Sequence, residues 1–188
     1  SKTILKIAQV ARQVSTAQRF GIGSGGVKTD WGKVIAHVKG VAEEIYAANS
    51  PDLLTDENIT IVEGAASFAD PYTVLAGDSV LTGKRILITT GAGPVIPPIP
   101  GLAETGFLTY RTIWDLEELP KRLLVLGGGA LGSEIAKAFN RLGSNVALLE
   151  GEPRILPKDE PEASEVLAQQ MRREGFDLRL GTMVERVG

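Results

Sequence analysis

Three glycines in the last third of the chain have the types and spacing of a nucleotide-binding loop. Gly127, Gly129 and Gly132 fit the pattern GxGxxG between an apolar run, LLVL, and a helical pattern. Gly127 would permit a tight turn, Gly129 would let the backbone approach a pyrophosphate, and Gly132 would let the helix pack closely on the strand. Ala130 and Leu131 belong to the same candidate loop, at a helix N-terminus whose N–H groups favour an anion.

A carboxylate completes this pattern. Glu150 ends the next apolar run, 18 residues after Gly132, close to the usual spacing of about 20. At that place it could accept both ribose hydroxyls of NAD and would repel a 2′-phosphate, which favours NAD over NADP. Arg154 could hold a phosphate, so NADP stays an alternative. A glycine-rich turn that binds nothing is the alternative without a ligand.

Alternating strand and helix patterns surround the loop. After Pro120 the order is strand (LLVLGG), helix (133–142), strand (NVALLE), helix (161–174) and strand (FDLRLG). This alternation predicts a parallel sheet with crossover helices, and therefore an α/β fold.

The first part of the chain has a different pattern. Helices are predicted at 1–19 and 31–48, followed by the short strands ITIVEG, AASFAD, YTVLAG, SVLTG and KRILITT. KRILITT is typical of a strand buried on both faces. The proline-rich GAGPVIPPIPG predicts a stiff, extended connector. We therefore expect one domain at 1–105, a linker at 106–119 and a second domain at 120–188.

Composition excludes several kinds of site. The 188 residues include no cysteine and a single histidine, His37, so thiolate chemistry, disulfides and His-pair zinc sites are absent from this sequence. The net charge of −3 argues against a nucleic-acid partner. No apolar run approaches the roughly 20 residues that span a bilayer, so we expect no membrane partner. These features favour a cytoplasmic protein.

The chain resembles the middle of the flavoprotein disulfide reductases, the class I pyridine nucleotide-disulfide oxidoreductase family. The family includes dihydrolipoamide dehydrogenase, glutathione reductase and mercuric reductase. The resemblance covers nearly the whole chain in the family's order: SKTILK, VEGAASFADPYTV, ITTGAGPVIPPIPG, WDLEELPKRLLVLGGGALGSE and LLEGEPRILP. The long second helix and TIWDLEELPKRL look closest to mercuric-reductase-like and dihydrolipoamide-dehydrogenase-like members.

The resemblance implies a particular domain content. It implies part of an FAD-binding Rossmann-like domain with a small antiparallel β-meander, followed by part of an NAD(P)-binding Rossmann domain. Because SKT follows a redox-active CxxxxC in the family, it also implies an internal fragment. The cysteines and the FAD pyrophosphate loop would precede Ser1, and a dimer domain with a His-Glu pair would follow Gly188.

The activity that the resemblance implies belongs to the complete enzyme, a homodimer. Hydride would pass between NAD(P)H and FAD, and electrons would continue to a redox disulfide and a small-molecule or disulfide acceptor. The protein would position these cofactors, which carry the chemistry. We expect the 188-residue chain alone to have no disulfide reductase activity.

Two charged residues match positions near the reacting rings of the family. Lys2 resembles the lysine that approaches the flavin N5 edge, and Glu134 resembles its partner glutamate beside the nicotinamide. Burial of an unpaired lysine is unfavourable, which gives such a pair a physical reason. The alternative is a solvated lysine in a first helical turn and a surface acid.

Other segments match the FAD-binding positions of the family. Gly64 and Ala65 correspond to backbone that touches the FAD adenosine, and Thr90 and Gly91 correspond to the segment that closes over FAD. Two further classes of function stay open beside the oxidoreductase. One is a non-catalytic NAD-binding or redox-sensing module, and the other is a structural or interaction fragment.

Overall fold

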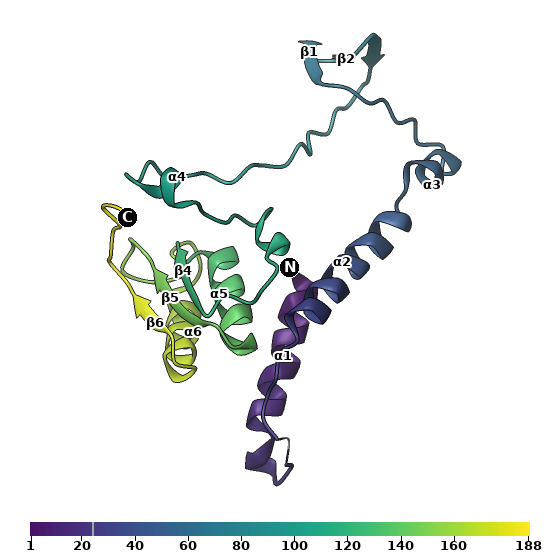
Figure 1. Cartoon of the computed structure of the whole chain (residues 1–188). Helices are drawn as coiled ribbons and strands as arrows, with labels where there is room; N and C mark the ends of the chain where they lie inside the picture. The colour runs from purple at the N-terminus through teal and green to yellow at the C-terminus, as the bar shows by residue number, and fades with distance from the viewer. Residues whose placement is uncertain (24) are drawn as a thin grey trace. The chain divides into compact units, whose positions relative to one another are not determined.

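The computed structural model describes residues 1–23 and 25–188 and divides the chain into two compact units (Figure 1). Unit 1 comprises Ser1–Gly40 together with Ile96–Gly188, and unit 2 comprises Val41–Val95. Helix α2, Trp31–Ala47, contributes residues to both units. These units group segments by their contacts and do not define domain limits. The domain limits at 105 and 120 therefore stay predictions.

Unit 1 contains the predicted parallel sheet. Its strands are β4 (Arg122–Leu126), β5 (Asn145–Leu149) and β6 (Asp177–Arg179), in that spatial order. Arg122 pairs with Asn145 and Ala147 pairs with Asp177, both in parallel register. The crossover helices are α5 (Ala130–Leu142) and α6 (Pro161–Arg173). The strand–helix alternation read from the sequence is therefore confirmed.

Helix α5 forms on this sheet because its apolar residues recur at helical spacing. Ile135, Phe139 and Leu142 are all buried, as a stripe with steps of four and three requires. The rings of Phe139 and Trp31, the first residue of α2, lie 5.3 Å apart between centroids. The indole N–H of Trp31 donates to the carbonyl of Leu116 at 2.8 Å, so this large side chain is buried with its polar atom satisfied.

A second helix packs on α5 within unit 1. Helix α1 (Lys2–Thr16) continues into a short 3₁₀ turn, η1 (Ala17–Phe20). Its residues Ile4, Ala8 and Ala11 are buried in the core that contains Ile135 and Phe139. Two small alanines in this stripe let the two helix backbones approach closely. The core of unit 1 therefore lies between α1, α5 and the parallel sheet.

The remaining short elements of unit 1 precede the sheet. Helix α4 spans Leu102–Thr105 and the 3₁₀ turn η2 spans Ile113–Asp115. Val187 donates its N–H to the carbonyl of Pro100 at 2.9 Å, which joins the segment after β6 to the end of the proline-rich connector.

Unit 2 contains the predicted antiparallel meander. Its strands β1 (Ala66–Asp70), β2 (Thr73–Ala76) and β3 (Ser79–Thr82) pair in sequence order. Helix α3 (Pro51–Asp56) precedes them. The strand predictions for ITIVEG and KRILITT are wrong: neither segment is a strand, and Leu87 and Ile88 are 86% and 66% exposed. A buried strand needs neighbours on both edges, and no described strand pairs with either segment.

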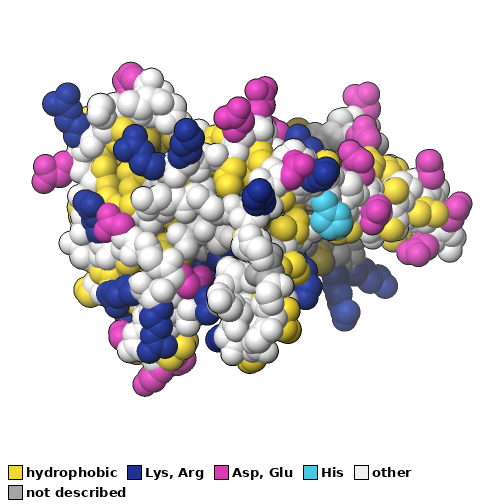
Figure 2. Space-filling model, turned by 60° about the horizontal axis from the view of Figure 1, so that its bottom comes forward, with side chains coloured by type: hydrophobic (Ala, Val, Ile, Leu, Met, Phe, Trp, Pro, Cys, Tyr) yellow, Lys and Arg dark blue, Asp and Glu magenta, His cyan; other side chains and the backbone are white. Residues whose placement is uncertain are grey.

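Charged side chains of both signs lie at the surface of the described residues. On the face shown in Figure 2, acidic and basic side chains are interspersed, and the exposed His37 appears in cyan on α2. Among the described residues, no helix has the length and apolar character that crossing a membrane requires.

Candidate nucleotide-binding site

The turn after β4 requires glycine at its first position. Gly127 has φ +102°, a backbone conformation that side-chain-bearing residues rarely adopt. Its N–H donates to the carbonyl of Leu149 at 2.8 Å, which continues the β4–β5 ladder into the turn. Gly127 therefore has the turn-forming role predicted from the sequence pattern.

The last glycine of the motif lies against the backbone of the first. A Cβ atom added to Gly132 would lie 2.0 Å from the Gly127 carbonyl oxygen and 3.6 Å from Cγ1 of Val125. Since no side chain fits there, α5 begins directly on the end of β4. This contact fixes the N-terminus of α5 at the carboxyl end of the sheet, where ligands of such folds bind.

The middle of the loop is open. A Cβ atom on Gly129 would meet no atom within 4 Å, so this glycine is not required by packing inside the chain. Gly129 is the N-cap of α5, and no side chain caps the helix. The first-turn N–H groups of Ala130 and Leu131, two exposed residues, have no intrahelical acceptor. An anion at this end would meet these donors and the positive end of the helix dipole.

Glu150 lies directly beside this loop. Its Oε2 accepts a hydrogen bond from the N–H of Gly128 at 2.6 Å, and its Oε1 accepts one from the N–H of Glu152 at 2.9 Å. The side chain is half-buried. Two backbone donors therefore fix the carboxylate at the end of β5, and its remaining lone pairs can accept hydroxyl protons.

Gly128 is a functional position that the sequence pattern did not single out. A Cβ atom there would lie 2.8 Å from Cγ2 of Ile155 and 3.2 Å from Oε2 of Glu150. The residue is buried, and its carbonyl accepts the N–H of Leu156 at 2.8 Å and the hydroxyl of Ser133 at 3.1 Å. The sequence signal for this position was the run of three consecutive glycines, 127–129. The pattern GxGxxG leaves the middle one of the three unspecified.

Arg154 is engaged by its own loop. Its two terminal nitrogens donate to the carbonyls of Asp159 and Pro157 at 2.7 and 2.8 Å. These bonds use two of its five N–H donors and hold the guanidinium against its own loop.

Lys2 and Glu134 lie on two packed helices, Lys2 in the first turn of α1 and Glu134 in the second turn of α5. Lys2 begins α1, Glu134 lies in the first half of α5, and both are exposed. None of the ion pairs in the described part of the chain joins them. Their role beside a nicotinamide stays a prediction.

The candidate FAD-contacting residues all belong to unit 2. A Cβ atom on Gly64 would lie 3.0 Å from the amide nitrogen of Gly77, so Gly64 packs against the turn between β2 and β3. Ala65, Thr90 and Gly91 are exposed, and Gly91 has φ +71°. Their contact with FAD stays a prediction.

The carboxylate of Glu174 joins three helices, although the sequence placed it only at the end of a predicted helix. Glu174 follows α6 and its side chain is only 10% exposed. It pairs with Arg12 of α1, and it accepts two hydrogen bonds from Arg141 of α5, at 2.8 and 2.9 Å. Gln170 donates to it at 2.8 Å. No local sequence pattern reports pairing over more than 150 residues.

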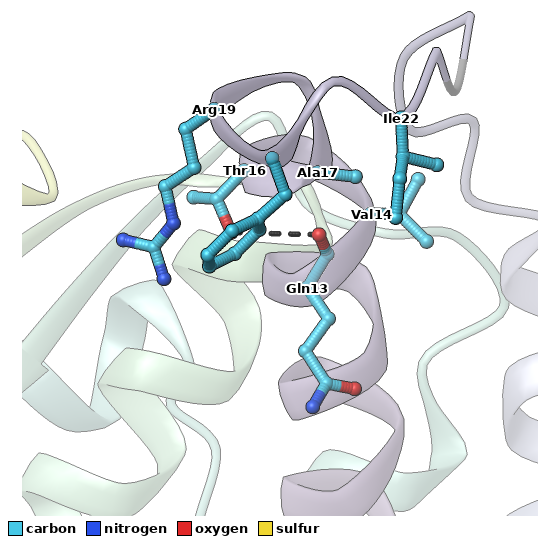
Figure 3. Close-up of a pocket in the computed structure, with 7 residues that line it drawn as sticks. Gln13, Val14, Thr16, Ala17, Arg19 and Ile22 are labelled. Atoms are coloured by element: carbon cyan, nitrogen blue, oxygen red, sulfur yellow. Dashed lines mark hydrogen bonds between the residues drawn. The ribbon is translucent and has the colours of Figure 1, made fainter.

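A separate hollow lies at the end of α1. It has a volume of about 590 Å³ and is lined by residues of α1 and η1, including Gln13, Thr16 and Arg19, and by Ile22 just after η1 (Figure 3). The hydroxyl of Thr16 donates to the carbonyl of Gln13 at 3.4 Å. None of the sequence-predicted site residues lines this hollow. No cluster of potential metal ligands exists among the described residues.

Comparisons with known proteins agree with this geometry. The family model described as "Pyridine nucleotide-disulphide oxidoreductase" matches residues 1–188. A mercuric reductase of Lysinibacillus sphaericus is 32% identical over 187 residues, which are all of this chain and 34% of that protein. A dihydrolipoyl dehydrogenase of Acholeplasma laidlawii is 30% identical over 193 residues, covering this chain fully and 57% of that protein.

A solved structure is similar over nearly the same length. The Cu(II) complex of the HOCl-induced flavoprotein disulfide reductase RclA from Escherichia coli superposes with a TM-score of 0.77 and 30% identity. The match covers 98% of this chain and 39% of that chain. The present chain therefore spans between one third and somewhat over half the length of these relatives. The predicted α/β fold, with its meander and parallel sheet, is confirmed.

Proposed function

Because the chain belongs to the pyridine nucleotide-disulphide oxidoreductase family, we propose that unit 1 binds NAD(H) at the Gly127–Gly132 loop. The observation that carries this proposal is the contrast between two glycines. Gly132 is enclosed by backbone, whereas Gly129 faces open space at an uncapped helix N-terminus. A loop shaped only for packing would need no glycine at the open position.

The bound dinucleotide would lie across the carboxyl ends of β4 and β5. Its pyrophosphate would accept hydrogen bonds from the first-turn N–H groups of α5, including those of Ala130 and Leu131. Its adenosine ribose would donate to Glu150, which the N–H of Gly128 already orients. A charge-assisted hydrogen bond of this type contributes about 1.5–3 kcal/mol.

The same contacts support NAD over NADP. A 2′-phosphate would replace a hydroxyl donor facing Glu150 with a second anion. The residue that the sequence offered to neutralise that charge, Arg154, donates to two loop carbonyls. Discrimination against NADPH therefore rests on repulsion by one fixed carboxylate.

Within a longer protein we assign this unit to an FAD- and NAD-dependent oxidoreductase. FAD, when bound, would supply the electron-accepting ring that exchanges hydride with the nicotinamide. Lys2 of α1 and Glu134 of α5 would orient and neutralise one another. The backbone of Gly64, Ala65, Thr90 and Gly91 would contact FAD.

Further features of that longer protein are proposals of the same kind. Its final acceptor would be a small molecule or a disulfide, in keeping with the named activities of the relatives. It would act as a homodimer in the cytoplasm. The 188-residue chain supplies no cysteine, so its own predicted activity is nucleotide binding without disulfide turnover.

Calorimetric titration of the 188-residue chain with NADH and NADPH tests the proposal. We expect one saturable NADH site and an affinity for NADPH at least tenfold weaker. Glu150→Gln, which keeps an acceptor and removes the charge, should weaken NADH and narrow the difference between the cofactors. Absence of NADH binding at millimolar concentration, or equal affinities for both cofactors, would count against the proposed site.

A further inference from the structure

One peptide unit in the loop after β5 joins helix α6 to the proposed dinucleotide loop. Its carbonyl, which belongs to Ile155, accepts the hydroxyl proton of Ser164 in α6 at 2.6 Å. Its N–H, which belongs to Leu156, donates to the carbonyl of Gly128 at 2.8 Å. Because a peptide unit is planar and resists rotation, the two hydrogen bonds act on one rigid group. The loop after β5 is therefore fixed to α6 on one side and to Gly128 on the other.

This connection is buried. Ser164 is 2% exposed and Ile155 is fully buried, and Gly128 is buried as well. Solvent cannot easily replace either hydrogen bond, and a buried carbonyl that loses its donor stays unpaired, which is unfavourable. The N–H of Ser164 donates to the carbonyl of Glu160 at 3.1 Å, so α6 holds the backbone of this serine in place.

The backbone of Leu156 shows that this arrangement is imposed by its surroundings. Leu156 has φ +49°, in the left-handed region, where the Cβ atom of a leucine crowds the backbone. Glycine or asparagine adopts this conformation more easily. A bulky residue keeps such a conformation only where the surrounding structure enforces it, and such positions often serve a function. The two hydrogen bonds of the peptide unit before Leu156 supply that enforcement.

The same loop determines the position of Gly128, whose N–H orients Glu150. Cγ2 of Ile155 lies 2.8 Å from the place that a Cβ atom of Gly128 would occupy, and Oε2 of Glu150 lies 3.2 Å from that place. The N–H of Gly128 donates to this oxygen at 2.6 Å. Gly128 is thus enclosed between the side chain of Ile155 and the carboxylate of Glu150. A displacement of Ile155 would therefore move the donor on which Glu150 depends.

We propose that Ser164 is a positioning residue for cofactor selection. Through the Ile155–Leu156 peptide unit, its hydroxyl holds Gly128 where the N–H of that glycine fixes the carboxylate of Glu150. The inference rests on the proposed NAD site and deepens it, since Ser164 is too buried to touch a nucleotide. Without this hydroxyl, Glu150 keeps the hydrogen bond from the N–H of Glu152 but can turn away from a 2′-phosphate. Discrimination against NADPH should then fall without being abolished.

Ser144 offers a matched control. It is 4% exposed, and its hydroxyl donates to the carbonyl of Pro120 at 2.6 Å, the same length as the bond made by Ser164. Ser144 directly precedes β5, whereas Glu150 directly follows it. Ser164→Ala and Ser144→Ala therefore remove the same group and the same kind of buried hydrogen bond at opposite ends of this strand. Only the first substitution should affect the dinucleotide loop.

Amide hydrogen exchange of the ¹⁵N-labelled 188-residue chain without nucleotide tests the positioning. The reference is the amide of Leu148, a fully buried residue of β5. Relative to this amide, Ser164→Ala should speed the exchange of Gly128 and Leu156 by at least tenfold through local opening, and Ser144→Ala should change it less than about twofold. Equal acceleration of all three amides in Ser164→Ala would indicate only a general loss of stability and would overturn the proposal, as would unchanged exchange.

Calorimetric titration of the same proteins with NADH and NADPH tests the selection. The ratio of the two dissociation constants should fall at least threefold in Ser164→Ala and stay at the wild-type value in Ser144→Ala. Leu156→Asn keeps the N–H and tolerates the positive φ, so it should keep the wild-type ratio. An unchanged ratio in Ser164→Ala would overturn the proposal. A loss of discrimination in Leu156→Asn would assign the effect to the leucine side chain and overturn the role of the peptide unit.

Failure of this inference is separable from failure of the proposed function. A wild-type chain that prefers NADH, with the same preference in Ser164→Ala, retains the dinucleotide site and loses the role of Ser164. A wild-type chain that binds neither nucleotide contradicts the proposed function, and cofactor selection by Ser164 fails with it. The exchange rates of Gly128 and Leu156 still show in that case whether Ser164 fixes the loop.

Discussion

Replacing Gly132 by alanine should disrupt the start of α5. The added methyl carbon would lie 2.0 Å from the Gly127 carbonyl oxygen, whereas ordinary van der Waals contact begins at 3.4 Å. Both partners of this contact are backbone, so rotation of a side chain cannot relieve it. Overpacking of this kind typically costs 1–3 kcal/mol, and we expect about 3 kcal/mol here.

Gly129→Ala is the matched control. Gly129 has φ −66°, which alanine adopts freely, and its Cβ would meet no atom within 4 Å. Its free energy of unfolding should therefore stay within about 0.5 kcal/mol of the wild type. The methyl group would instead stand between the backbone and the pyrophosphate, so NADH affinity should fall about tenfold, or roughly 1.4 kcal/mol.

Urea unfolding followed by tryptophan fluorescence separates the two effects. Trp31 packs on Phe139 of α5, so its emission reports unit 1. With a typical m-value of about 2 kcal/mol/M, Gly132→Ala should lower the unfolding midpoint by about 1.5 M. A Gly132→Ala protein as stable as the wild type would refute the packing argument, and a Gly129→Ala protein with unchanged NADH affinity would refute the binding argument.

Three further predictions follow from charged residues. Glu174→Ala should destabilise unit 1 by about 3 kcal/mol in urea unfolding, because the mostly buried Arg141 and the partly exposed Arg12 lose their carboxylate. Asp177→Asn, which breaks an exposed ion pair, should leave the unfolding midpoint unchanged. Equal effects of the two substitutions would contradict the role assigned to Glu174. Glu150→Gln should weaken NADH about tenfold in calorimetry and leave the melting temperature within a few degrees; an unchanged affinity would place the ribose elsewhere. Folding lowers the pKa of Lys137 through burial and the nearby arginines, so between the folded and unfolded pKa values the unfolded chain binds more protons, and the stability of the wild type rises with pH. Lys137→Met should therefore be more stable than the wild type at pH 7, and this gain should shrink as the pH approaches 10.5. A stability difference that does not change with pH would contradict the assigned burial and repulsion of Lys137.

Local patterns predicted the parts of the fold that depend on local chemistry. The sequence pattern predicted a helix at 133–142, and α5 spans Ala130–Leu142 with Ile135, Phe139 and Leu142 buried. The glycine spacing predicted both the turn at Gly127 and the contact at Gly132, because these roles depend on backbone conformation within six residues. The three strands of the meander also follow from short apolar runs between turn residues.

Long-range pairing could not be predicted in the same way. KRILITT has the composition of a buried strand, but a strand forms only where neighbours supply hydrogen bonds, and composition does not report neighbours. The ion pair of Glu174 with Arg12 joins residues that are remote in sequence, so the sequence placed this carboxylate only at the end of a predicted helix. The orientation of Glu150 by Gly128 depends equally on a contact between separate turns.

Amide chemical-shift mapping of ¹⁵N-labelled chain during NADH titration tests the central claim most directly. The account predicts that the largest perturbations fall on Gly127–Gly132 and on residues around Glu150, with saturation at one equivalent. Perturbations concentrated in the hollow at the end of α1, or the absence of saturable changes, would contradict the assignment of the dinucleotide site to this loop.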